Sequence, residues 1–295
     1  MQVPSHVEYE RARSVEHALE LLTRYGPESR VLAGGHSLIP MMKLRLAQPE
    51  TLIDINGISG LSRLSVADGE LRIGALVRHA QLLASPLAAR HFPILRDAEQ
   101  VIADPIVRNW GTIGGSLCQA DPSEDLSAAF GALRATAVIQ GRDGPRRVPV
   151  REFHLGPYET VVAPDELLTE LRVPIPPAGA RSGSAYEKVS RRVGDWSVAA
   201  AGAVLTLDSA GAVTEAGIGL AAVGAGHFVS EAAEEFLRGQ PAEDAAFIRA
   251  GQLAAEHCRP AADQRGPVDY KRHLTGELTT RALRRAAVRA GVAET

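Results

Sequence analysis

Two short glycine-containing segments carry the residue types best suited to binding a ligand. One is Ala33–Ser37 (AGGHS) and the other is Thr112–Ser116 (TIGGS). Glycine lets a backbone turn sharply or lie close to a ligand, and each segment adds a hydroxyl side chain. A helix is expected to begin at Ser37, and the N-terminus of a helix attracts anions through its free N–H groups.

A single glycine pair more often marks a tight turn than a binding site. In this chain the two pairs fall in neighbouring subdomains, as the pattern of elements described below indicates. Two segments that converge from two subdomains could hold a diphosphate from both sides without a lysine. The combination therefore favours a phosphate-binding site over two unrelated turns.

Other motifs give no support for a different chemistry. Residues 217–222 (GIGLAA) match the dinucleotide-binding pattern G-x-G-x-x-A, but that turn must lead directly into a helix. The chain continues as VGAG at residues 223–226, which disfavours a helix, so the match is interpreted as a coincidence. The sequence contains no Walker loop, no G-x-S-x-G elbow and no H-E-x-x-H motif. Its nine histidines are scattered, and Cys118 and Cys258 are its two cysteines, which argues against a zinc site, an iron–sulfur cluster or a disulfide framework.

Length and charge limit the remaining classes of protein. A chain of 295 residues suggests two or three domains. The net charge of −3 gives no basic field for nucleic acid or an anionic membrane. No apolar run approaches the roughly 20 residues of a transmembrane helix, and residues 1–14 lack the pattern of a signal peptide. A reducing cytoplasm is the expected location.

The first elements that could position the glycine segments form a β-α-β unit. A helix is predicted first, capped by Ser14 and ended by Gly26. Its apolar face consists of Val15, Ala18, Leu19 and Leu22. A strand follows at residues 30–35, then the helix from Ser37, and then a short apolar strand at residues 51–55.

The middle of the chain has a different pattern of hydrophobic and polar residues. From Leu61, apolar and polar residues alternate about residues 68–69 (Asp-Gly), which predicts a hairpin. Short helices are expected at residues 79–85 and 93–104. A further helix, with acidic residues in its first turn, is expected from Ser123.

The last part of the chain indicates a separate α+β domain. A second hairpin at residues 136–150 and a segment at 165–177, which closes with a proline-rich linker, precede it. Long strands are predicted at residues 184–190, 197–208 and 213–224, followed by alanine-rich helices. Strands followed by helices are typical of an α+β domain.

Three ordered segments together resemble a known family. They are residues 33–55 (AGGHSLIPMMKLRLAQPETLIDI), 102–126 (IADPIVRNWGTIGGSLCQADPSEDL) and 186–196 (YEKVSRRVGDW). The sequence resembles the medium, FAD-binding subunits of the molybdenum hydroxylases. It is most similar to the carbon monoxide dehydrogenase flavoproteins and more distantly similar to the FAD domain of the xanthine dehydrogenases. The likeness extends over almost the whole chain.

The resemblance implies a fold in three parts. Residues 1–57 and 58–177 would be the two subdomains of an FAD-binding fold of the vanillyl-alcohol oxidase type. Residues 178–295 would form the family's C-terminal α+β domain, an antiparallel sheet with helices. The fold class expected is therefore α+β.

The resemblance also implies the cofactor-binding residues. They are Leu32, Ala33, Gly34, Gly35, His36, Ser37, Leu38, Ile39, Ile102, Thr112, Ile113, Gly114, Gly115, Ser116, Asp125, Leu168, Lys188 and Trp196. Residues 32–39 would surround the FAD pyrophosphate, and residues 112–116 would form the second wall. The binding of FAD is expected to be noncovalent, with His36 near the phosphates, although a Gly-Gly-His can anchor flavin covalently in oxidases of the wider fold.

The same resemblance gives individual roles to five of these residues. Asp125 would bond a ribose or adenosine hydroxyl, and Ile102 would pack against the isoalloxazine. Leu168 and Lys188 would hold the flavin side of the cofactor, and Trp196 would lie near the ring. Simpler readings stay open for three of them: helix-start electrostatics for Asp125, a solvated strand residue for Lys188, and a domain-interface aromatic for Trp196.

The function that follows from the resemblance is electron transfer. A large subunit with a molybdenum cofactor and a small subunit with [2Fe–2S] clusters would be the partners, assembled as a dimer of heterotrimers. Electrons from the clusters would pass through FAD to an external acceptor, and the chain alone would oxidise no organic substrate. No catalytic acid or base and no metal ligand is assigned. Two alternatives stay open, a self-contained flavin oxidase and a noncatalytic binding or assembly module. The aromatic content of 4% favours the relay over the oxidase.

Overall fold

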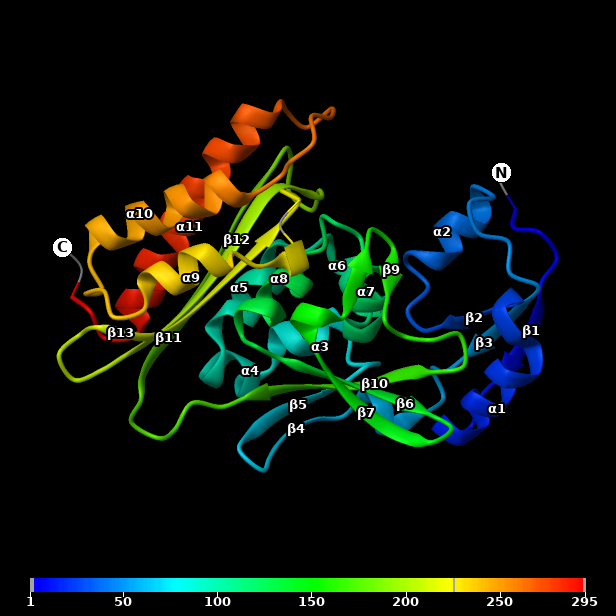
Figure 1. The fold of residues 1–295 in the computed structure, drawn as a ribbon. Coiled ribbons are helices and arrows are strands. Elements are labelled where there is room, and N and C mark those ends of the chain that lie inside the picture. Colours follow the sequence, from blue (N-terminus) through cyan, green and yellow to red (C-terminus); the bar gives the residue numbers. More distant parts are fainter. Residues whose placement is uncertain (1–2, 225, 294–295) are drawn as a thin grey trace.

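The computed structural model describes residues 3–224 and 226–293. Figure 1 shows three parts in chain order: a small sheet with two helices at the N-terminal end, a larger sheet with short helices in the middle, and a long-stranded sheet with helices at the C-terminal end. None of the helices in these ranges has the length and hydropathy that a bilayer crossing requires.

The N-terminal part is a parallel sheet with its connecting helices. Its elements are β1 (Glu8–Arg11), α1 (Val15–Tyr25), β2 (Ser29–Leu32), α2 (Leu38–Lys43) and β3 (Thr51–Asp54). The strand order is β1–β3–β2. Ser14 caps α1 as predicted, because its hydroxyl accepts a hydrogen bond from the N–H of His17 at 3.1 Å. The sequence pattern does not predict β1, since its residues are polar and mostly exposed at the sheet edge.

The middle part contains a five-stranded antiparallel sheet. Its strands are β4 (Leu64–Ala67), β5 (Glu70–Gly74), β6 (Thr136–Gly141), β7 (Gly144–Pro149) and β10 (Leu167–Pro174). The order β4–β5–β10–β6–β7 confirms both predicted hairpins. Residues 165–177 do more than close the region with a linker, because β10 within them is the central strand. A separate two-stranded ribbon pairs β8 (His154–Gly156) with β9 (Glu159–Thr160).

Six short helices belong to this part, and all of them except α6 contribute buried residues to a hydrophobic core that they share with the sheet. They are α3 (His79–Ala84), α4 (Pro86–His91), α5 (Pro93–Val101), α6 (Pro105–Trp110), α7 (Ile113–Gln119) and α8 (Asp125–Ala132). The sequence reading missed α4 and α6 and extended α5 beyond its end at Val101. The cap of α8 is Glu124 rather than Ser123, because the Glu124 carboxylate accepts hydrogen bonds from two N–H groups of the first turn.

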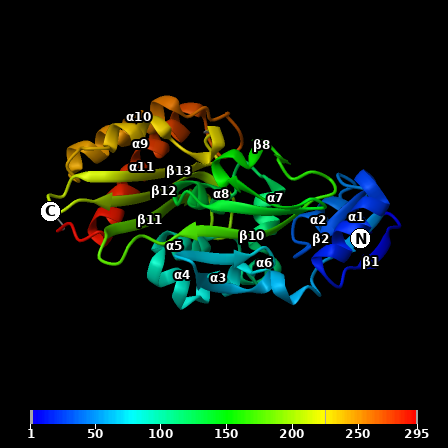
Figure 2. The ribbon, with the colours of Figure 1, turned by 60° about the horizontal axis from the view of Figure 1, so that its bottom comes forward.

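The C-terminal part is the predicted sheet with helices. Its strands are β11 (Arg181–Ser190), β12 (Ser197–Leu207) and β13 (Val213–Ala221), which Figure 2 shows side by side. Its helices are α9 (Glu231–Leu237), α10 (Asp244–His257) and α11 (Val268–Arg289). Short 3-10 helices lie at Gly226–Phe228 in this part and, in the two preceding parts, at Gly26–Glu28, Ser59–Ser62 and Val150–Glu152.

The G-x-G-x-x-A match at residues 217–222 is indeed unrelated to a dinucleotide turn, since its first five residues belong to β13. A Cβ atom at Gly217 would lie 2.0 Å from the carbonyl oxygen of Ala132, and one at Gly219 would lie 1.9 Å from that of Ala128. Both glycines therefore allow α8 to pack closely against the sheet. Glu234 of α9 adds ion pairs to Arg134 and Arg151, which join the middle and C-terminal parts.

Candidate functional site

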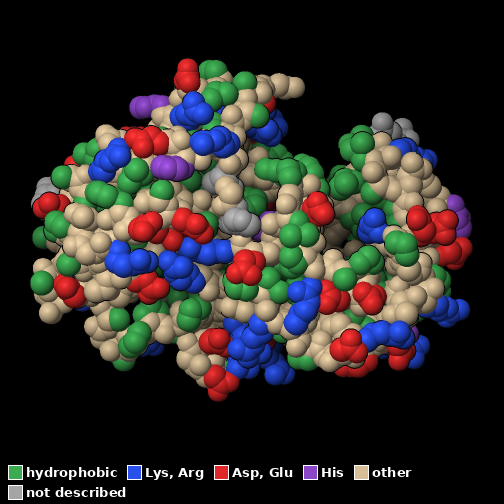
Figure 3. All heavy atoms as spheres, viewed as in Figure 1, with side chains coloured by type: hydrophobic (Ala, Val, Ile, Leu, Met, Phe, Trp, Pro, Cys, Tyr) green, Lys and Arg blue, Asp and Glu red, His purple; other side chains and the backbone are tan. Residues whose placement is uncertain are grey.

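A large cleft separates the N-terminal part from the remainder of the chain. Its volume is about 1100 Å³, and both glycine segments line it. Figure 3 shows the hollow between the two lobes. This volume is slightly above the usual range of about 300–1,000 Å³ for small-molecule sites, so the cleft has room for a large cofactor.

The first glycine segment, residues 33–37, connects β2 to α2 and lies directly against the second. A Cβ atom at Gly34 would lie 2.2 Å from the carbonyl oxygen of Trp110 and 2.9 Å from the Cα of Gly111. Only glycine allows this approach. In the described part of the chain, the N–H groups of residues 34–37 donate to no protein acceptor. These donors are available to a ligand at the cleft wall.

The second segment, residues 112–116, has a different role from the one that its glycines suggest. Residues 113–116 form the first turn of α7, rather than a loop, and their four N–H groups all donate to protein acceptors. Those acceptors are the carbonyl oxygens of Val77, Ala75 and Thr112 and the hydroxyl of Thr112. The glycines allow close packing, since a Cβ at Gly114 would lie 2.7 Å from the Cβ of Ala75. This wall therefore offers hydroxyl groups instead of backbone N–H groups.

Two side chains, Arg78 and Asn56, link the first segment to the end of α6, just before the second segment. Arg78 donates hydrogen bonds to the carbonyl oxygen of Trp110 and, at 2.7 Å, to Oδ1 of Asn56. Asn56 in turn donates through Nδ2 to the carbonyl oxygen of Ala33 at 2.7 Å. The cleft wall is therefore preorganised by the protein before any ligand arrives.

A buried histidine connects one of these hydroxyls to a buried carboxylate. Nε2 of His79 lies 3.0 Å from Oγ of Ser116, and Nδ1 lies 3.0 and 3.1 Å from the two carboxylate oxygens of Glu99. His79 is 3% exposed and Glu99 is 0% exposed. Burial lowers the pKa of His79, but the charge and hydrogen bond of Glu99 outweigh it and raise that pKa above its usual value.

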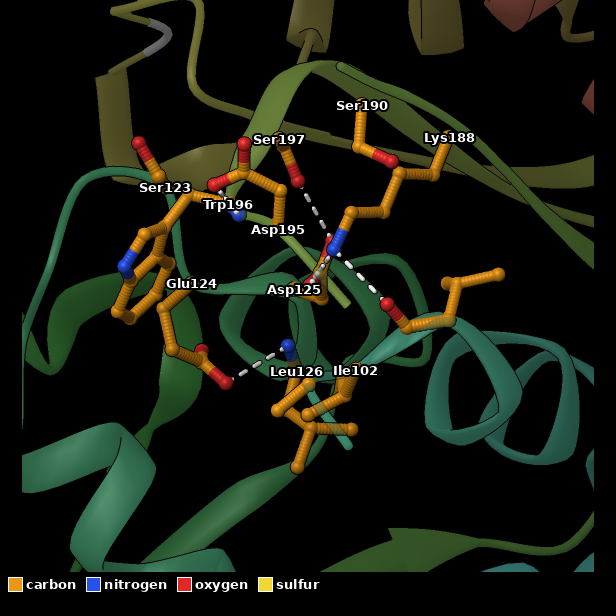
Figure 4. Close-up of polar contacts among 12 residues, drawn as sticks. Ile102, Ser123, Glu124, Asp125, Leu126, Lys188, Ser190, Asp195, Trp196 and Ser197 are labelled. Atoms are coloured by element: carbon orange, nitrogen blue, oxygen red, sulfur yellow. Dashed lines mark hydrogen bonds and ion pairs between the residues drawn. The ribbon is translucent and has the colours of Figure 1, made fainter. Parts of the chain in front are cut away.

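Asp125 is a second buried carboxylate in the cleft lining, and Figure 4 shows its contacts with Lys188 and Ser197. Asp125 accepts hydrogen bonds from Lys188 Nζ at 2.8 Å, from the Tyr186 hydroxyl at 2.9 Å and from the Ser197 hydroxyl at 2.8 Å. Lys188 also donates to the carbonyl oxygen of Val101 at 3.1 Å. The cluster joins α8 to β11 and β12, so Asp125 has a structural role here beyond helix-start electrostatics.

The segment of residues 194–196, which includes Trp196, packs closely against Ala103, the residue after Ile102. A Cβ at Gly194 would lie 3.0 Å from the carbonyl oxygen of Ala103. Asp195 accepts a hydrogen bond from the N–H of Trp196 at 2.8 Å, and Trp196 is 46% exposed. One side of the cleft is therefore formed by residues 102–103 and 194–196 together.

The cleft gathers most of the site residues expected from the sequence. Its lining includes Ala33, Gly34, Gly35, His36, Ser37, Leu38, Ile102, Thr112, Gly114, Gly115, Ser116, Asp125, Leu168, Lys188 and Trp196. Three expected residues do not line it. Leu32 and Ile39 lie beside Gly35, and Ile113 is fully buried in the core.

Several lining residues were not expected, among them His79, Cys118, Gln119, Glu124 and Tyr158. Burial raises the pKa of Glu124 to about 7. For Glu99, which contacts His79, one feature of the sequence could have indicated a functional role. Glu99 follows Leu95 by four residues on the apolar face of α5, and an acidic residue on such a face implies a buried partner.

The lining residues suit a large ligand with an anionic part and an apolar part. Residues 33–37 supply donor groups to the lining, and Ile102, Leu168 and Trp196 supply apolar side chains. In the described ranges, no three His, Cys, Asp or Glu side chains are grouped so that they could hold a metal ion. The combination of donor groups and apolar side chains is what a dinucleotide cofactor requires.

Comparison with known proteins gives the family. Residues 5–176 match the model of the FAD-binding domain in molybdopterin dehydrogenase, and residues 184–286 match that of the CO dehydrogenase flavoprotein C-terminal domain. The chain belongs to the FAD-binding medium subunits of the molybdenum hydroxylases, the family that includes carbon monoxide dehydrogenase medium chains. It is accordingly an oxidoreductase subunit.

Individual relatives agree over nearly the full length. The carbon monoxide dehydrogenase medium chain of Afipia carboxidovorans is 40% identical, over 98% of this chain and 99% of the relative. A carbon monoxide dehydrogenase structure from Hydrogenophaga pseudoflava has a TM-score of 0.93 and 42% identity, covering 97% of this chain and 99% of that one. Quinoline 2-oxidoreductase from Pseudomonas putida 86 has a TM-score of 0.90 and 30% identity, covering 98% and 100%.

Proposed function

We propose that this chain holds FAD in the cleft and serves as the electron-transfer subunit of a molybdenum-containing hydroxylase or dehydrogenase. The observation that carries the proposal is the set of free N–H groups at residues 34–37, held against Trp110 and Gly111 where only glycine fits. An FAD pyrophosphate needs such donors, and no lysine lies at that end of the cleft lining.

The apolar end of the cleft would receive the isoalloxazine. Ile102 and Leu168 offer aliphatic surface, and Trp196 offers an aromatic face. Lys188 is held by Asp125 and by a backbone carbonyl, so its position is fixed before binding. FAD supplies the capacity to take up and release electrons; the chain binds, orients and shields it. The proposed site comprises the eighteen residues assigned from the resemblance, with Leu32, Ile39 and Ile113 supporting it from behind.

The partners in this proposal are a large molybdenum-binding subunit and a small [2Fe–2S] subunit, arranged as a dimer of heterotrimers in the cytoplasm. The relatives are subunits of named multi-chain enzymes, one of them a subunit of the 6-hydroxypseudooxynicotine dehydrogenase complex of Paenarthrobacter nicotinovorans. Electrons would enter from the small subunit and leave to an external acceptor. In this account residues 1–57 and 58–177 form the FAD-binding part, and residues 178–295 form the C-terminal domain.

A test separates a relay from a self-contained oxidase. The FAD-loaded chain without partners is mixed anaerobically with alcohols, aldehydes and N-heterocycles, and the absorbance of oxidised flavin is followed. The relay account predicts no bleaching until a chemical reductant is added. Adding the iron–sulfur and molybdenum subunits should then confer bleaching by the substrate of the complex. Rapid bleaching of the chain alone by an organic substrate would contradict the proposal in favour of an oxidase.

A further inference from the structure

The second wall of the cleft poses a hydrogen-bonding problem for an anion. The N–H groups of residues 113–116 are all used within the protein. Thr112 is 2% exposed, and its hydroxyl already accepts from the N–H of Gly115. The Ser116 hydroxyl is more accessible and lines the cleft. Ser116 is therefore the group on this wall that is best placed to donate a hydrogen bond to a phosphate.

Whether Ser116 can donate toward the cleft depends on the proton it shares with His79. The Oγ to Nε2 distance of 3.0 Å requires one of the two groups to be the donor. If Nε2 carries no proton, the Ser116 hydroxyl donates to it, and only lone pairs face the anion. If Nε2 carries a proton, it donates to Oγ, and the hydroxyl proton is free to point into the cleft.

Glu99 decides which of these states the pair adopts. With one proton added, the pair is either imidazolium with carboxylate, or a carboxylic acid that donates to Nδ1 of a neutral ring. Nε2 carries a proton in both arrangements, so the outcome for Ser116 is the same. Without that proton, the carboxylate holds the proton on Nδ1, and Nε2 becomes an acceptor.

We propose that His79 and Glu99 are positioning residues that turn the Ser116 hydroxyl toward the FAD pyrophosphate, so that FAD affinity depends on one proton bound by the His79–Glu99 pair. The inference rests on the proposed function. It explains how a wall without free N–H groups contributes to an anion site. It also gives a role to a buried carboxylate that binding alone does not require.

Charged groups on the neighbouring elements modify this proton affinity. Glu124, at the start of α8, favours the charged imidazole, and Arg108 of α6 opposes it. Burial raises the pKa of Glu99, and Asp125 raises it further, while His79 and Arg108 lower it. The net effect raises the pKa of both His79 and Glu99. The pair therefore keeps its proton to higher pH than a free imidazole does.

The expected pH dependence has a definite sign. Because FAD prefers the protonated pair, its affinity is constant at pH values below the pKa of the pair in the free protein. Above that pKa, the Kd rises by up to about tenfold per pH unit, since one proton must be taken up on binding, until it levels off at the value of the unprotonated pair. The midpoint should lie above the ordinary histidine value of about 6.5.

The experiment measures the Kd of FAD by quenching of flavin fluorescence between about pH 6 and 9, around the ordinary histidine value. It uses the flavin-stripped full chain together with any partner subunits that purify with it. Glu99→Gln removes the carboxylate that holds the proton, so the midpoint should move to lower pH. Ser116→Ala should weaken binding roughly 10-fold or more at pH 6, by loss of a hydrogen bond to a charged group, and abolish the pH dependence.

His79→Gln keeps a donor without titration and should give a pH-independent Kd. The matched control is His91→Gln, a histidine on α4 that does not line the cleft, and it should reproduce the wild-type profile. Thermal unfolding of each variant checks folding, and Ser116→Ala decides the matter if the buried variants do not fold. A wild-type Kd that does not vary with pH, or a Ser116→Ala profile equal to the wild-type one, would overturn the inference and leave FAD binding intact. No FAD binding at any pH would overturn the proposed function and the inference together.

Discussion

Cys118 can report directly on whether the cleft is filled. Its side chain is exposed and lines the cleft, yet the surrounding protein atoms desolvate the thiolate and raise the pKa of the thiol to about 12. We expect slow alkylation by a maleimide at alkaline pH, and strong protection by FAD. At an FAD concentration about 100 times the Kd, labelling should fall roughly 100-fold, because only the ligand-free fraction reacts.

Mass spectrometry of the labelled protein provides the measurement. Cys258 is 1% exposed and serves as the internal control, because it should react only after unfolding. Labelling of Cys118 at the same rate with and without saturating FAD would place the cofactor elsewhere.

Among the residues of the Asp125 cluster (Asp125, Tyr186, Lys188 and Ser197), replacement of Asp125 should lower the free energy of unfolding most. Asp125→Asn leaves the ammonium of Lys188, whose side chain is 3% exposed, without its carboxylate. Breaking a buried pair in this way typically costs about 3–5 kcal/mol in the free energy of unfolding. Lys188→Met should cost less, because Tyr186 and Ser197 still donate to Asp125.

Urea unfolding measures these changes, and an exposed pair provides the control. Glu256→Gln breaks the surface ion pair with Arg249 and should cost less than about 1 kcal/mol. The double variant at Asp125 and Lys188 should lose less stability than the sum of the two single losses. If Asp125→Asn were no worse than Glu256→Gln, the cluster would not be the structural junction described here.

At the residue scale, the sequence predicted features that follow from residue type alone. It did not predict features that follow from contacts between residues far apart in the chain. The glycine–hydroxyl segments stood out because glycine has a local physical meaning. That the N–H groups of residues 113–116 are already used could not be foreseen, since their acceptors include Ala75 and Val77, which the fold brings into contact. His79 gave no local signal, and Glu99 gave one only through its place on an apolar face.

At the element scale, the contact between the β2–α2 connection and the end of α6 shapes the part of the cleft where the pyrophosphate is proposed to bind. Gly34→Ala would place a Cβ 2.2 Å from the carbonyl oxygen of Trp110, so one backbone segment must move. We expect a stability loss of roughly 1–3 kcal/mol, as for overpacking, and a weaker affinity for FAD. Gly60→Ala is the matched control, since a Cβ there meets nothing within 4 Å, and its effect should stay within about 0.5 kcal/mol.

Equilibrium unfolding and FAD titration of the two variants provide the comparison. A Gly34→Ala protein with unchanged stability and unchanged FAD affinity would show that the close approach of the two segments is not required.

Elements with a strong local pattern were predictable, and those without one were not. Both hairpins and the three long C-terminal strands have alternating or apolar runs, and the structure confirms them. β1 is a polar edge strand that pairs only because β3 lies beside it. α6 was not predicted, although it begins with Pro105 after the capping Asp104, which is a local signal of a new helix.

At the scale of the whole molecule, the cleft lies between parts that are far apart in sequence. Residues 33–37, 112–116 and 188–196 come from three sheets or their connections, and no single segment forms the site. The family resemblance predicted that these segments come together, because members of a family share a fold and therefore its tertiary contacts. Composition and periodicity alone could not have placed Trp196 in the same cleft as the glycine segments.

The central claim is that this cleft holds one noncovalent FAD, and the flavin content of the purified protein tests it most directly. The chain, purified with its partners, is precipitated with acid, and FAD is quantified in the supernatant and in the pellet. The account predicts about one FAD per copy of the chain, all of it in the supernatant. A folded protein that contains no flavin and takes up none when FAD is added, or flavin that stays on the denatured chain and disappears in His36→Ala, would contradict it.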